Sequence, residues 1–303
     1  MLMIETKQLS KVYGVHDVVK GIDLTVRKGE IFGFLGRNGA GKSTFINMLT
    51  GIISPSSGKY FLMGKAGPDA NVMKKVGVMP DYSSFYSNWT AMDHLQFFSA
   101  LSSKKASKIR CVEILKKVDL VTHANKKTGK FSFGMKKKLA IAQAIIHDPE
   151  LIFLDEPTSG MDIESAIHIH RLISELQEQG KTIFMTSHNL AEVEKICTRI
   201  AIMRDGIIDK IGTMEELRSF YRSTITVRLK HAKVPKLAEG KLKQWLESAG
   251  TIREYGDTYT VMIVWHEQKI AEMIRAFTQC KVDVFRVDVE EPTLEEIFLN
   301  EEE

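Results

Sequence analysis

Apolar and polar positions divide the chain into stretches with different periodicities. Over residues 1–31 they alternate, which predicts a half-exposed antiparallel sheet. Short continuous apolar runs follow, and they predict buried strands over 30–35, 58–63, 76–79, 151–154 and 182–186. The chain is therefore expected to form an α/β fold in which an antiparallel sheet precedes a second, more buried sheet.

Helical patterns separate these strands, and several begin with a capping signal. Thr90 is followed three residues later by Asp93, which predicts a helix start near Ala91 and helical structure to about Ala124. Ser132 is expected to cap a helix that runs to about His147. A further helix is predicted from Asp162 to Gln179, closed by Gly180, and Asp205-Gly206 predicts a hairpin turn.

The pattern changes near Ser219. Beyond it the sequence predicts strand, helix, hairpin, helix and strand over 224–230, 240–249, 251–265, 268–280 and 281–289. This order is typical of a split-βαβ module. We therefore predict two domains, residues 1–219 and 220–303. The second carries no phosphate loop, metal-ligand spacing or nucleophile–base pair, so we expect regulation or dimer support from it.

The amino-acid composition mainly argues against certain partners and locations. The chain has 303 residues, 44% hydrophobic and 26% charged, and a formal charge of +4 is too small to favour a nucleic-acid partner. No apolar run approaches the roughly 20 residues of a membrane span, and from the residue pattern we do not expect the first residues to act as a signal peptide. The three cysteines, Cys111, Cys197 and Cys280, fit small buried residues in a reducing compartment.

The most specific motif is a phosphate-binding loop between the predicted strand 30–35 and an apolar-faced helix. It consists of Gly36, Arg37, Asn38, Gly39, Ala40, Gly41, Lys42, Ser43 and Thr44, which match G-x-x-x-x-G-K-[ST]. Glycines allow backbone N–H groups to surround an anion, and the helix N-terminus adds its dipole. Lys42 is expected to reach the β- and γ-phosphates, and the Ser43 hydroxyl to ligate Mg2+.

Two carboxylates follow the apolar run 151–154, Asp155 and Glu156. Ligands bind at the carboxyl edge of strands in open α/β sheets, so Asp155 is expected to hold Mg2+ through water. Glu156 is placed to take a proton from an attacking water. His188 follows the next strand, where it would contact the γ-phosphate near Glu156. The alternative for Asp155 and Glu156 is an acidic turn at the end of the strand, and the alternative for His188 is a purely structural role.

The segment Phe131-Ser132-Phe133-Gly134-Met135 opens the helix before the acidic strand. A serine cap followed by glycine leaves N–H groups and a positive dipole end, which predicts a second anion site. Taken alone, however, the pentapeptide is weak evidence for such a site, and the default interpretation is an ordinary capped helix with Lys136, Lys137 and Lys138 on a solvated basic face.

In this order, the phosphate loop, the capped Ser-x-Gly helix, the Leu-Asp-Glu strand and the histidine resemble the nucleotide-binding subunit of an ABC transporter. The resemblance covers residues 1 to about 218 and implies a P-loop ABC ATPase cassette, with a mixed-sheet core, an antiparallel β subdomain and a helical subdomain at about 82–148. It implies Mg2+-dependent ATP hydrolysis and a head-to-tail homodimer or heterodimer. Each ATP would lie between the phosphate loop of one subunit and Ser132 and Gly134 of the other.

Other positions are assigned by the same resemblance. Ser159-Gly160-Met161-Asp162 is similar to the D-loop, which places Asp162 at the dimer interface, and Tyr13 lies where the adenine-stacking aromatic is found. Two positions depart from the pattern. Phe133 and Met135 replace a glycine and a glutamine of the signature, and Asp81 stands where glutamine is common near Mg2+.

The end of the chain, from Val287 to Leu299, resembles a bacterial branch in which the ATPase is a separate chain. There it partners an integral membrane permease, often an exporter, at the cytoplasmic face of the membrane. Tyr82, Phe85, Tyr86 and Trp89 lie in the segment that would touch this permease. The same aromatics also fit a locally packed subdomain core.

Two other functions remain open on the sequence. One is a soluble ABC-type ATPase in translation or DNA repair, although the chain has one phosphate loop and no sustained heptads. The other is a nucleotide-sensing regulator with little turnover, which Phe133 and Asp81 suggest and Glu156 and His188 oppose.

Overall fold

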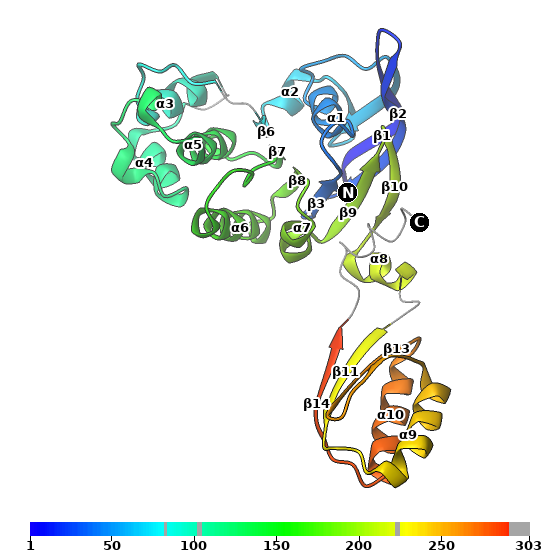
Figure 1. The fold of residues 1–303 in the computed structure, drawn as a ribbon. Coiled ribbons are helices and arrows are strands. Elements are labelled where there is room, and N and C mark those ends of the chain that lie inside the picture. Colours follow the sequence, from blue (N-terminus) through cyan, green and yellow to red (C-terminus); the bar gives the residue numbers. More distant parts are fainter. Residues whose placement is uncertain (82–83, 102–104, 222–224, 291–303) are drawn as a thin grey trace. The chain divides into compact units, whose positions relative to one another are not determined.

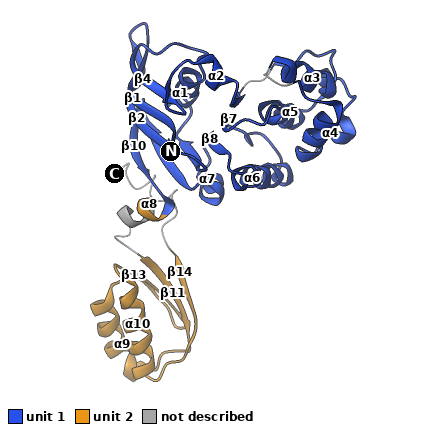
Figure 2. Cartoon of the chain, turned by 180° about the vertical axis from the view of Figure 1, so that it is seen from behind, with its two compact units in different colours: residues 1–214 blue, residues 215–303 orange. Residues whose placement is uncertain are grey.

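The computed structural model describes residues 1–81, 84–101, 105–221 and 225–290 (Figure 1). The chain divides into two compact units, Met1–Met214 and Glu215–Glu303 (Figure 2). This division falls five residues before the boundary at 219/220 expected from the sequence. It assigns most of helix α8, Met214–Tyr221, to the second unit.

The first unit begins with the antiparallel sheet predicted from the alternating pattern. Its strands are β1 (Leu2–Tyr13), β2 (His16–Arg27), β4 (Ser57–Leu62) and β5 (Lys65–Ala66). They pair in the order β2-β1-β4-β5. In β2 the alternate residues Ile22, Leu24 and Val26 are buried, so one face of the sheet packs against the core.

A six-stranded sheet forms the centre of the unit, in the order β10-β9-β3-β8-β7-β6. Its strands are β3 (Ile31–Leu35), β6 (Val76–Met79), β7 (Leu151–Asp155), β8 (Thr182–Ser187), β9 (Arg199–Arg204) and β10 (Ile207–Gly212). Neighbouring strands are parallel except in the β9–β10 hairpin. The carboxyl ends of β3, β8, β7 and β6 therefore share one edge, and the sheet is mixed as expected.

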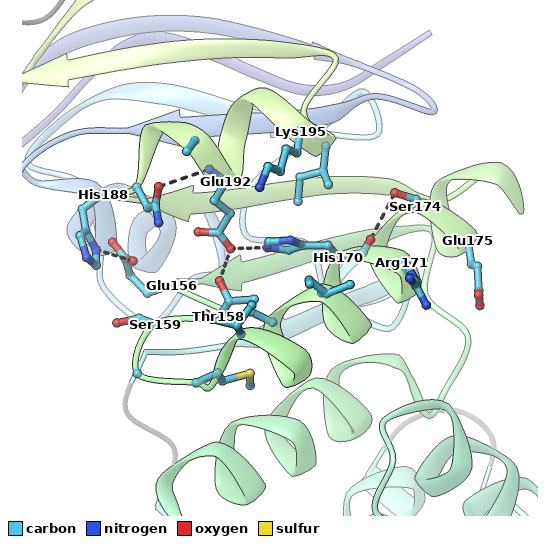
Figure 3. Close-up of a pocket in the computed structure, with 18 of the residues that line it drawn as sticks. Glu156, Thr158, Ser159, His170, Arg171, Ser174, Glu175, His188, Glu192 and Lys195 are labelled. Atoms are coloured by element: carbon cyan, nitrogen blue, oxygen red, sulfur yellow. Dashed lines mark hydrogen bonds and ion pairs between the residues drawn. The ribbon is translucent and has the colours of Figure 1, made fainter. Parts of the chain in front are cut away.

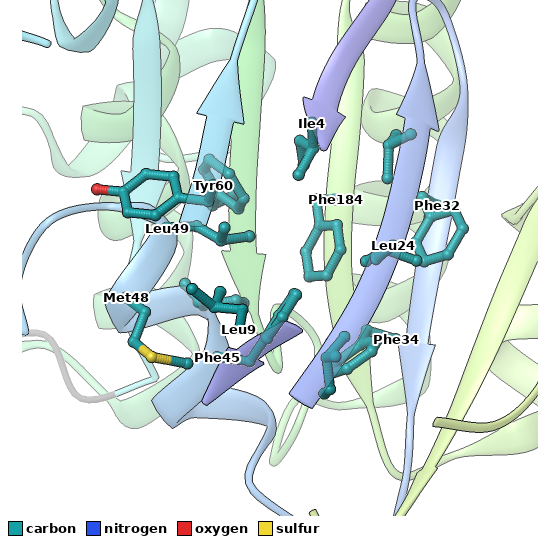
Figure 4. Packing of buried hydrophobic residues seen from close by; sticks show 14 of the residues in the cluster. Ile4, Leu9, Leu24, Phe32, Phe34, Phe45, Met48, Leu49, Tyr60 and Phe184 are labelled. Carbon is teal, nitrogen blue, oxygen red and sulfur yellow. The ribbon is translucent and has the colours of Figure 1, made fainter. Parts of the chain in front are cut away.

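Aromatic residues fill the space between the sheets and helix α1 (Lys42–Leu49) (Figure 4). Phe34 stacks on Phe45 with ring centroids 5.0 Å apart, and Phe32 stacks on Phe184 at 5.6 Å. All four are fully buried. Such burial contributes about 1.5–3 kcal/mol per side chain and fixes the strand and helix that flank the phosphate loop.

The helical subdomain contains α3 (Ala91–Leu101), α4 (Lys108–Lys117) and α5 (Phe133–Ile145), with short 3-10 turns at Val121–His123 and Thr128–Lys130. The capping box is present, because the Thr90 N–H donates to Asp93 at 2.9 Å and the Asp93 N–H to the Thr90 hydroxyl at 3.1 Å. Part of the stretch 126–130, expected to be a polar loop, is one of the 3-10 turns. Lys127, which precedes this turn, forms an isolated antiparallel β-bridge with Thr90.

The aromatics of this subdomain pack around His94, which is fully buried. Ring centroids of Phe85 and Trp89 lie 5.2 and 5.4 Å from that of His94. The locally packed interpretation therefore holds for these two rings, whereas Tyr86 remains exposed. Tyr82 lies outside the described residues.

Two short helices, α2 (Ala70–Met73) and α7 (Leu190–Ile196), and the longer helix α6 (Ile163–Glu178) also belong to the first unit. Asp162 caps α6 and Asn189 caps α7. Among the described residues, no helix combines the length and apolar character needed to cross a membrane.

The second unit has the element order predicted for a split-βαβ module. It comprises β11 (Ile225–His231), α9 (Lys236–Ala249), β12 (Thr251–Tyr255), β13 (Tyr259–Val264), α10 (Glu267–Gln279) and β14 (Val284–Glu290). The sheet order is β12-β13-β11-β14, all antiparallel. Its core gathers around Phe277, Met262 and Leu246. Residues 291–299, in which most of the family-like tail falls, lie outside the described residues.

Candidate functional site

The phosphate loop connects β3 to α1 in a conformation that requires glycine at two positions. Gly41 has φ 108°, and a Cβ there would lie 2.6 Å from the backbone oxygen of Val18. A Cβ on Gly36 would lie 2.5 Å from the oxygen of Met203. Arg37, Asn38 and Gly39 are exposed at the tip, whereas Ala40 is buried. The loop thus presents its backbone at the carboxyl edge of the sheet.

Lys42, the first residue of α1, folds back over this loop. Its Nζ donates to the oxygen of Gly36 at 2.7 Å and to that of Arg37 at 3.3 Å. The side chain is 6% exposed. An ammonium buried this far needs partners, and an anion in the loop would replace the two carbonyls with charge-assisted hydrogen bonds.

Asp155 ends β7 and is 3% exposed. Burial raises the pKa of its carboxyl, and hydrogen bonds with the hydroxyls of Thr186 and Ser43 oppose that increase. Thr186 lies directly opposite on β8. Asp155 and Ser43 thus form a pair of oxygen ligands next to the phosphate loop, and a cation there would favour the ionised carboxylate.

Glu156 follows with φ 51°, the left-handed region that non-glycine residues rarely adopt. Its N–H donates to the Thr186 hydroxyl at 2.9 Å. Its Oε2 lies 2.8 Å from Nδ1 of His188 (Figure 3), and its Oε1 lies 3.4 Å from the Lys42 ammonium. Oε1 is buried without a hydrogen-bond partner in the structure.

The structure therefore brings together the phosphate-loop residues Lys42 and Ser43, the β7 end with Asp155 and Glu156, and His188 after β8. Their convergence follows from the parallel pairing of β3, β8 and β7.

The capped helix α5 begins as the sequence predicts, with Ser132 accepting the Met135 N–H at 3.3 Å. Ser132 and Phe133 are exposed, and Gly134 is half-buried. A Cβ on Gly160 would lie 2.8 Å from the Phe133 ring. The phenyl group that replaces the signature glycine thus lies against the D-loop segment of the same chain.

The predicted solvated basic face is wrong for Lys137 and Lys138, which are buried. Lys138 pairs with Asp119 at 3.1 Å. The Lys137 ammonium lies 3.1 Å from Oδ1 of Asp81 and also donates to the backbone oxygen of Glu156. Helical periodicity could not identify these contacts, because Asp81 and Glu156 lie on other elements. Asp81, expected near Mg2+, is thus ion-paired through one oxygen.

The remaining predicted site residues occupy the following places. The Asp162 carboxylate accepts the Ser165 N–H at 2.9 Å as the cap of α6, and this backbone hydrogen bond lowers the pKa of Asp162. Tyr13 ends β1 with its ring half-exposed, and the Lys11 ammonium lies 5.0 Å from the ring centroid. Thr44 lies in the first turn of α1.

Sequence reasoning missed a buried network behind His188, centred on Glu192 of α7 (Figure 3). Glu192 accepts hydrogen bonds from Ser187 at 2.7 Å and from Thr158, and Nε2 of His170 lies 2.7 Å from its Oε1. Burial raises the pKa of Glu192, but these hydrogen bonds outweigh burial and the pKa is lowered. The signal in the sequence is the capping-box spacing from Asn189 to Glu192.

This network lines a pocket of about 780 Å³ between α6, α7 and the loop after β7. Glu156 and His188 reach the same pocket, as do Ser159 and Gly160 of the D-loop segment. The network therefore links the backbone that carries His188 to the segment after Glu156.

Comparisons with known proteins agree with this geometry. The family model described as ABC transporter matches residues 19–159. The chain is 33% identical to the linearmycin resistance ATP-binding protein LnrL of Bacillus subtilis, over 98% of this chain and 97% of that protein. It is 32% identical to the bacitracin transport ATP-binding protein BcrA of Bacillus licheniformis, over 98% and 96%.

Among solved structures, the chain is similar to the dimeric bacterial ABC transporter cassette MJ0796. The TM-score is 0.66 at 25% identity, with 70% of this chain and 99% of that chain covered. An ATP-binding subunit of an ABC transporter also matches, with a TM-score of 0.66 at 26% identity over 72% of this chain and 93% of that chain.

Proposed function

The chain belongs to the ATP-binding subunits of ABC transporters, which hydrolyse ATP to power transport, and on this premise we propose that it drives export through a separate integral membrane permease. Subunits of this family dimerise and pair with permeases. The proposal of export is supported by relatives named for linearmycin resistance and bacitracin transport, which match over nearly their whole length. The place of action is then the cytoplasmic face of the membrane.

The observation that carries the catalytic assignment is the convergence of Lys42 and His188 on the carboxylate of Glu156. ATP binds with its phosphates in the loop, and Lys42 turns from Glu156 to the β- and γ-phosphates. Glu156 then accepts the proton of the attacking water, and His188 holds Oε2 and faces the γ-phosphate.

Ser43 and Asp155 are the residues that would hold Mg2+. Their fit rests on the donor set, since a serine hydroxyl and a carboxylate, adjacent and hydrogen-bonded, are oxygen ligands of the kind Mg2+ prefers. The ion would neutralise charge on the β- and γ-phosphates. Asp81 would contribute through its second oxygen, because Oδ1 accepts from Lys137.

In the dimer, Ser132 and Gly134 act on the ATP held by the other subunit, and Asp162 lies at the same interface. The Ser132 oxygen accepts from Met135, which leaves its hydroxyl hydrogen available to donate to a γ-phosphate. The exposed N-terminus of α5 adds its dipole. Tyr13, at the end of β1, would stack on adenine.

Steady-state hydrolysis of Mg-ATP by Glu156→Gln tests the assignment. The amide keeps the shape of the side chain and cannot accept the proton, so turnover should fall by about 10²–10⁴-fold with ATP affinity retained. Glu150→Gln is the matched control, since Glu150 precedes β7 and pairs with Lys75. Normal turnover in Glu156→Gln would show that another group is the base.

Co-purification of the full chain with an integral membrane permease tests the proposed partner.

A further inference from the structure

The backbone of Glu156 adopts a conformation that its own residue type does not favour. With φ 51° it is left-handed, and such residues persist where surrounding groups fix them. This residue also carries the carboxylate proposed as the general base. Its backbone direction determines where that carboxylate points.

Side chains from two other elements hold the peptide groups on either side of Glu156. The Thr186 hydroxyl accepts its N–H at 2.9 Å, and the Lys137 ammonium donates to its carbonyl oxygen. The same oxygen accepts the Ser159 N–H at 3.4 Å, a longer hydrogen bond within the following turn. Lys137 is the charged donor of the set and comes from helix α5.

The position of Lys137 is closely determined by its surroundings. Its side chain is 4% exposed, and an ammonium this buried is costly unless it is paired. Asp81 supplies the counter-charge at 3.1 Å, and the ring of Phe133 lies 5.5 Å away. A buried, paired donor aimed at one backbone carbonyl is rigid, which is what positioning a reactive group requires.

We propose that Lys137 is a positioning residue for ATP hydrolysis, which holds the left-handed backbone of Glu156 so that the carboxylate stays between His188 and Lys42. This inference rests on the proposed role of Glu156. Without the ammonium, the peptide after Glu156 loses its charged partner and the carboxylate leaves its alignment with the γ-phosphate.

Substitution of Lys137 in the full-length chain, with turnover and ATP affinity measured separately, tests the proposal. Lys137→Met should lower kcat at least about 10-fold, because small misplacements of reacting groups are costly. ATP affinity should stay within about twofold, because Lys137 does not touch the phosphate loop. Lys137→Arg, which keeps a charged donor, should restore most of the turnover. Lys138→Met is the matched control, since Lys138 is a buried neighbour paired with Asp119.

A double variant separates positioning from general loss of structure. In a Glu156→Gln background, Lys137→Met should reduce turnover no further, because it acts through Glu156. If Lys137→Met does not fold, Lys137→Gln is tested instead. The glutamine side chain is polar but uncharged and one bond shorter than that of lysine, so kcat should again fall while ATP affinity is retained.

Wild-type turnover in Lys137→Met would overturn the inference, as would an equal loss of turnover in Lys138→Met or an additive loss in the double variant. The proposed function fails separately: it falls if Glu156→Gln itself hydrolyses ATP normally. If Glu156→Gln is inactive while Lys137→Met is unaffected, only the role of Lys137 is refuted.

Discussion

The Lys42 ammonium lies 3.4 Å from Oε1 of Glu156, so the cation of the phosphate loop and the proposed base are paired with each other. Both side chains are largely buried, and Oε1 has no hydrogen bond. A γ-phosphate in the loop would compete for the ammonium and free the carboxylate to accept a proton from water. Binding of ATP and activation of the base would then be coupled through one ion pair.

The first prediction concerns the cation of this pair. Lys42→Ala should weaken ATP binding by roughly 10–100-fold, because a charge-assisted contact with phosphate is lost. The variant also leaves the Glu156 carboxylate buried without its ion-pair partner. Titration with a fluorescent ATP analogue measures the effect, and Lys59→Ala, at an exposed position of β4, is the control. Unchanged affinity would mean that Lys42 does not contact the phosphates.

The second prediction concerns the dimer. In a mixture of Lys42→Ala and Ser132→Arg subunits, one composite site carries both defects and the other carries neither. Activity should therefore return partly from two inactive parents, provided that the subunits exchange. Exchange is followed independently by fluorescence transfer between labelled subunits. If exchange is complete and the mixture stays inactive, Ser132 does not act across the dimer.

The third prediction is a pH dependence of stability that arises from Glu192. Hydrogen bonds from His170, Thr158 and Ser187 lower the pKa of Glu192 in the folded chain despite its burial. Its stabilising contribution is thus fully present above the unfolded pKa of about 4.3 and is lost as the pH falls through the lower folded value. Glu192→Gln should lower the free energy of unfolding by about 1–3 kcal/mol near neutral pH.

Urea denaturation at several pH values measures this effect. The difference between the original chain and Glu192→Gln should begin to shrink below the unfolded pKa of about 4.3 and should be smallest below the lower folded pKa, where the carboxyl is protonated in both states. Glu175→Gln is the control, because Glu175 is an exposed residue of α6 that lines the same pocket, and this variant should show little change at any pH. A difference that persists unchanged into acid would assign the destabilisation to packing.

The sequence predicts those parts of the site that depend on strand ends. Asp155, Glu156 and His188 converge because β7 and β8 are adjacent and parallel, and apolar runs with polar ends carry that information. The contacts of Lys137 depend instead on how α5 packs against β6 and β7. Three consecutive lysines give no sign of which one turns inward, and its partner Asp81 lies 56 residues away.

A similar limit applies to the backbone of Glu156 and to the Glu192 network. The left-handed φ of Glu156 could not be predicted from its residue type, because glutamate by itself disfavours this backbone conformation. The spacing of Asn189 and Glu192 predicts a capped helix, but not that the carboxylate turns toward His170 on α6.

The two units have separate hydrophobic cores, which bears on how far ATP chemistry depends on the second unit. The core around Phe32, Phe34 and Phe45 draws on residues from Met3 to Ile208. The core around Phe277 draws on residues from Ile225 to Val287. Each group of apolar side chains is therefore supplied by its own part of the chain.

The last prediction is that a chain ending at Tyr221 binds ATP with an affinity within about twofold of the full chain, because the proposed ATP-site residues lie in the first unit, whose core is separate from that of the second. We expect it to self-associate less, or to lose coupling to its permease. Nucleotide titration and analytical sedimentation measure both properties. In the full chain, Phe277→Ala should destabilise the second unit by about 3–5 kcal/mol and leave ATP affinity unchanged, which controls for the truncation itself. A collapse of ATP affinity in a truncated but folded cassette would show that the phosphate site depends on residues beyond Tyr221.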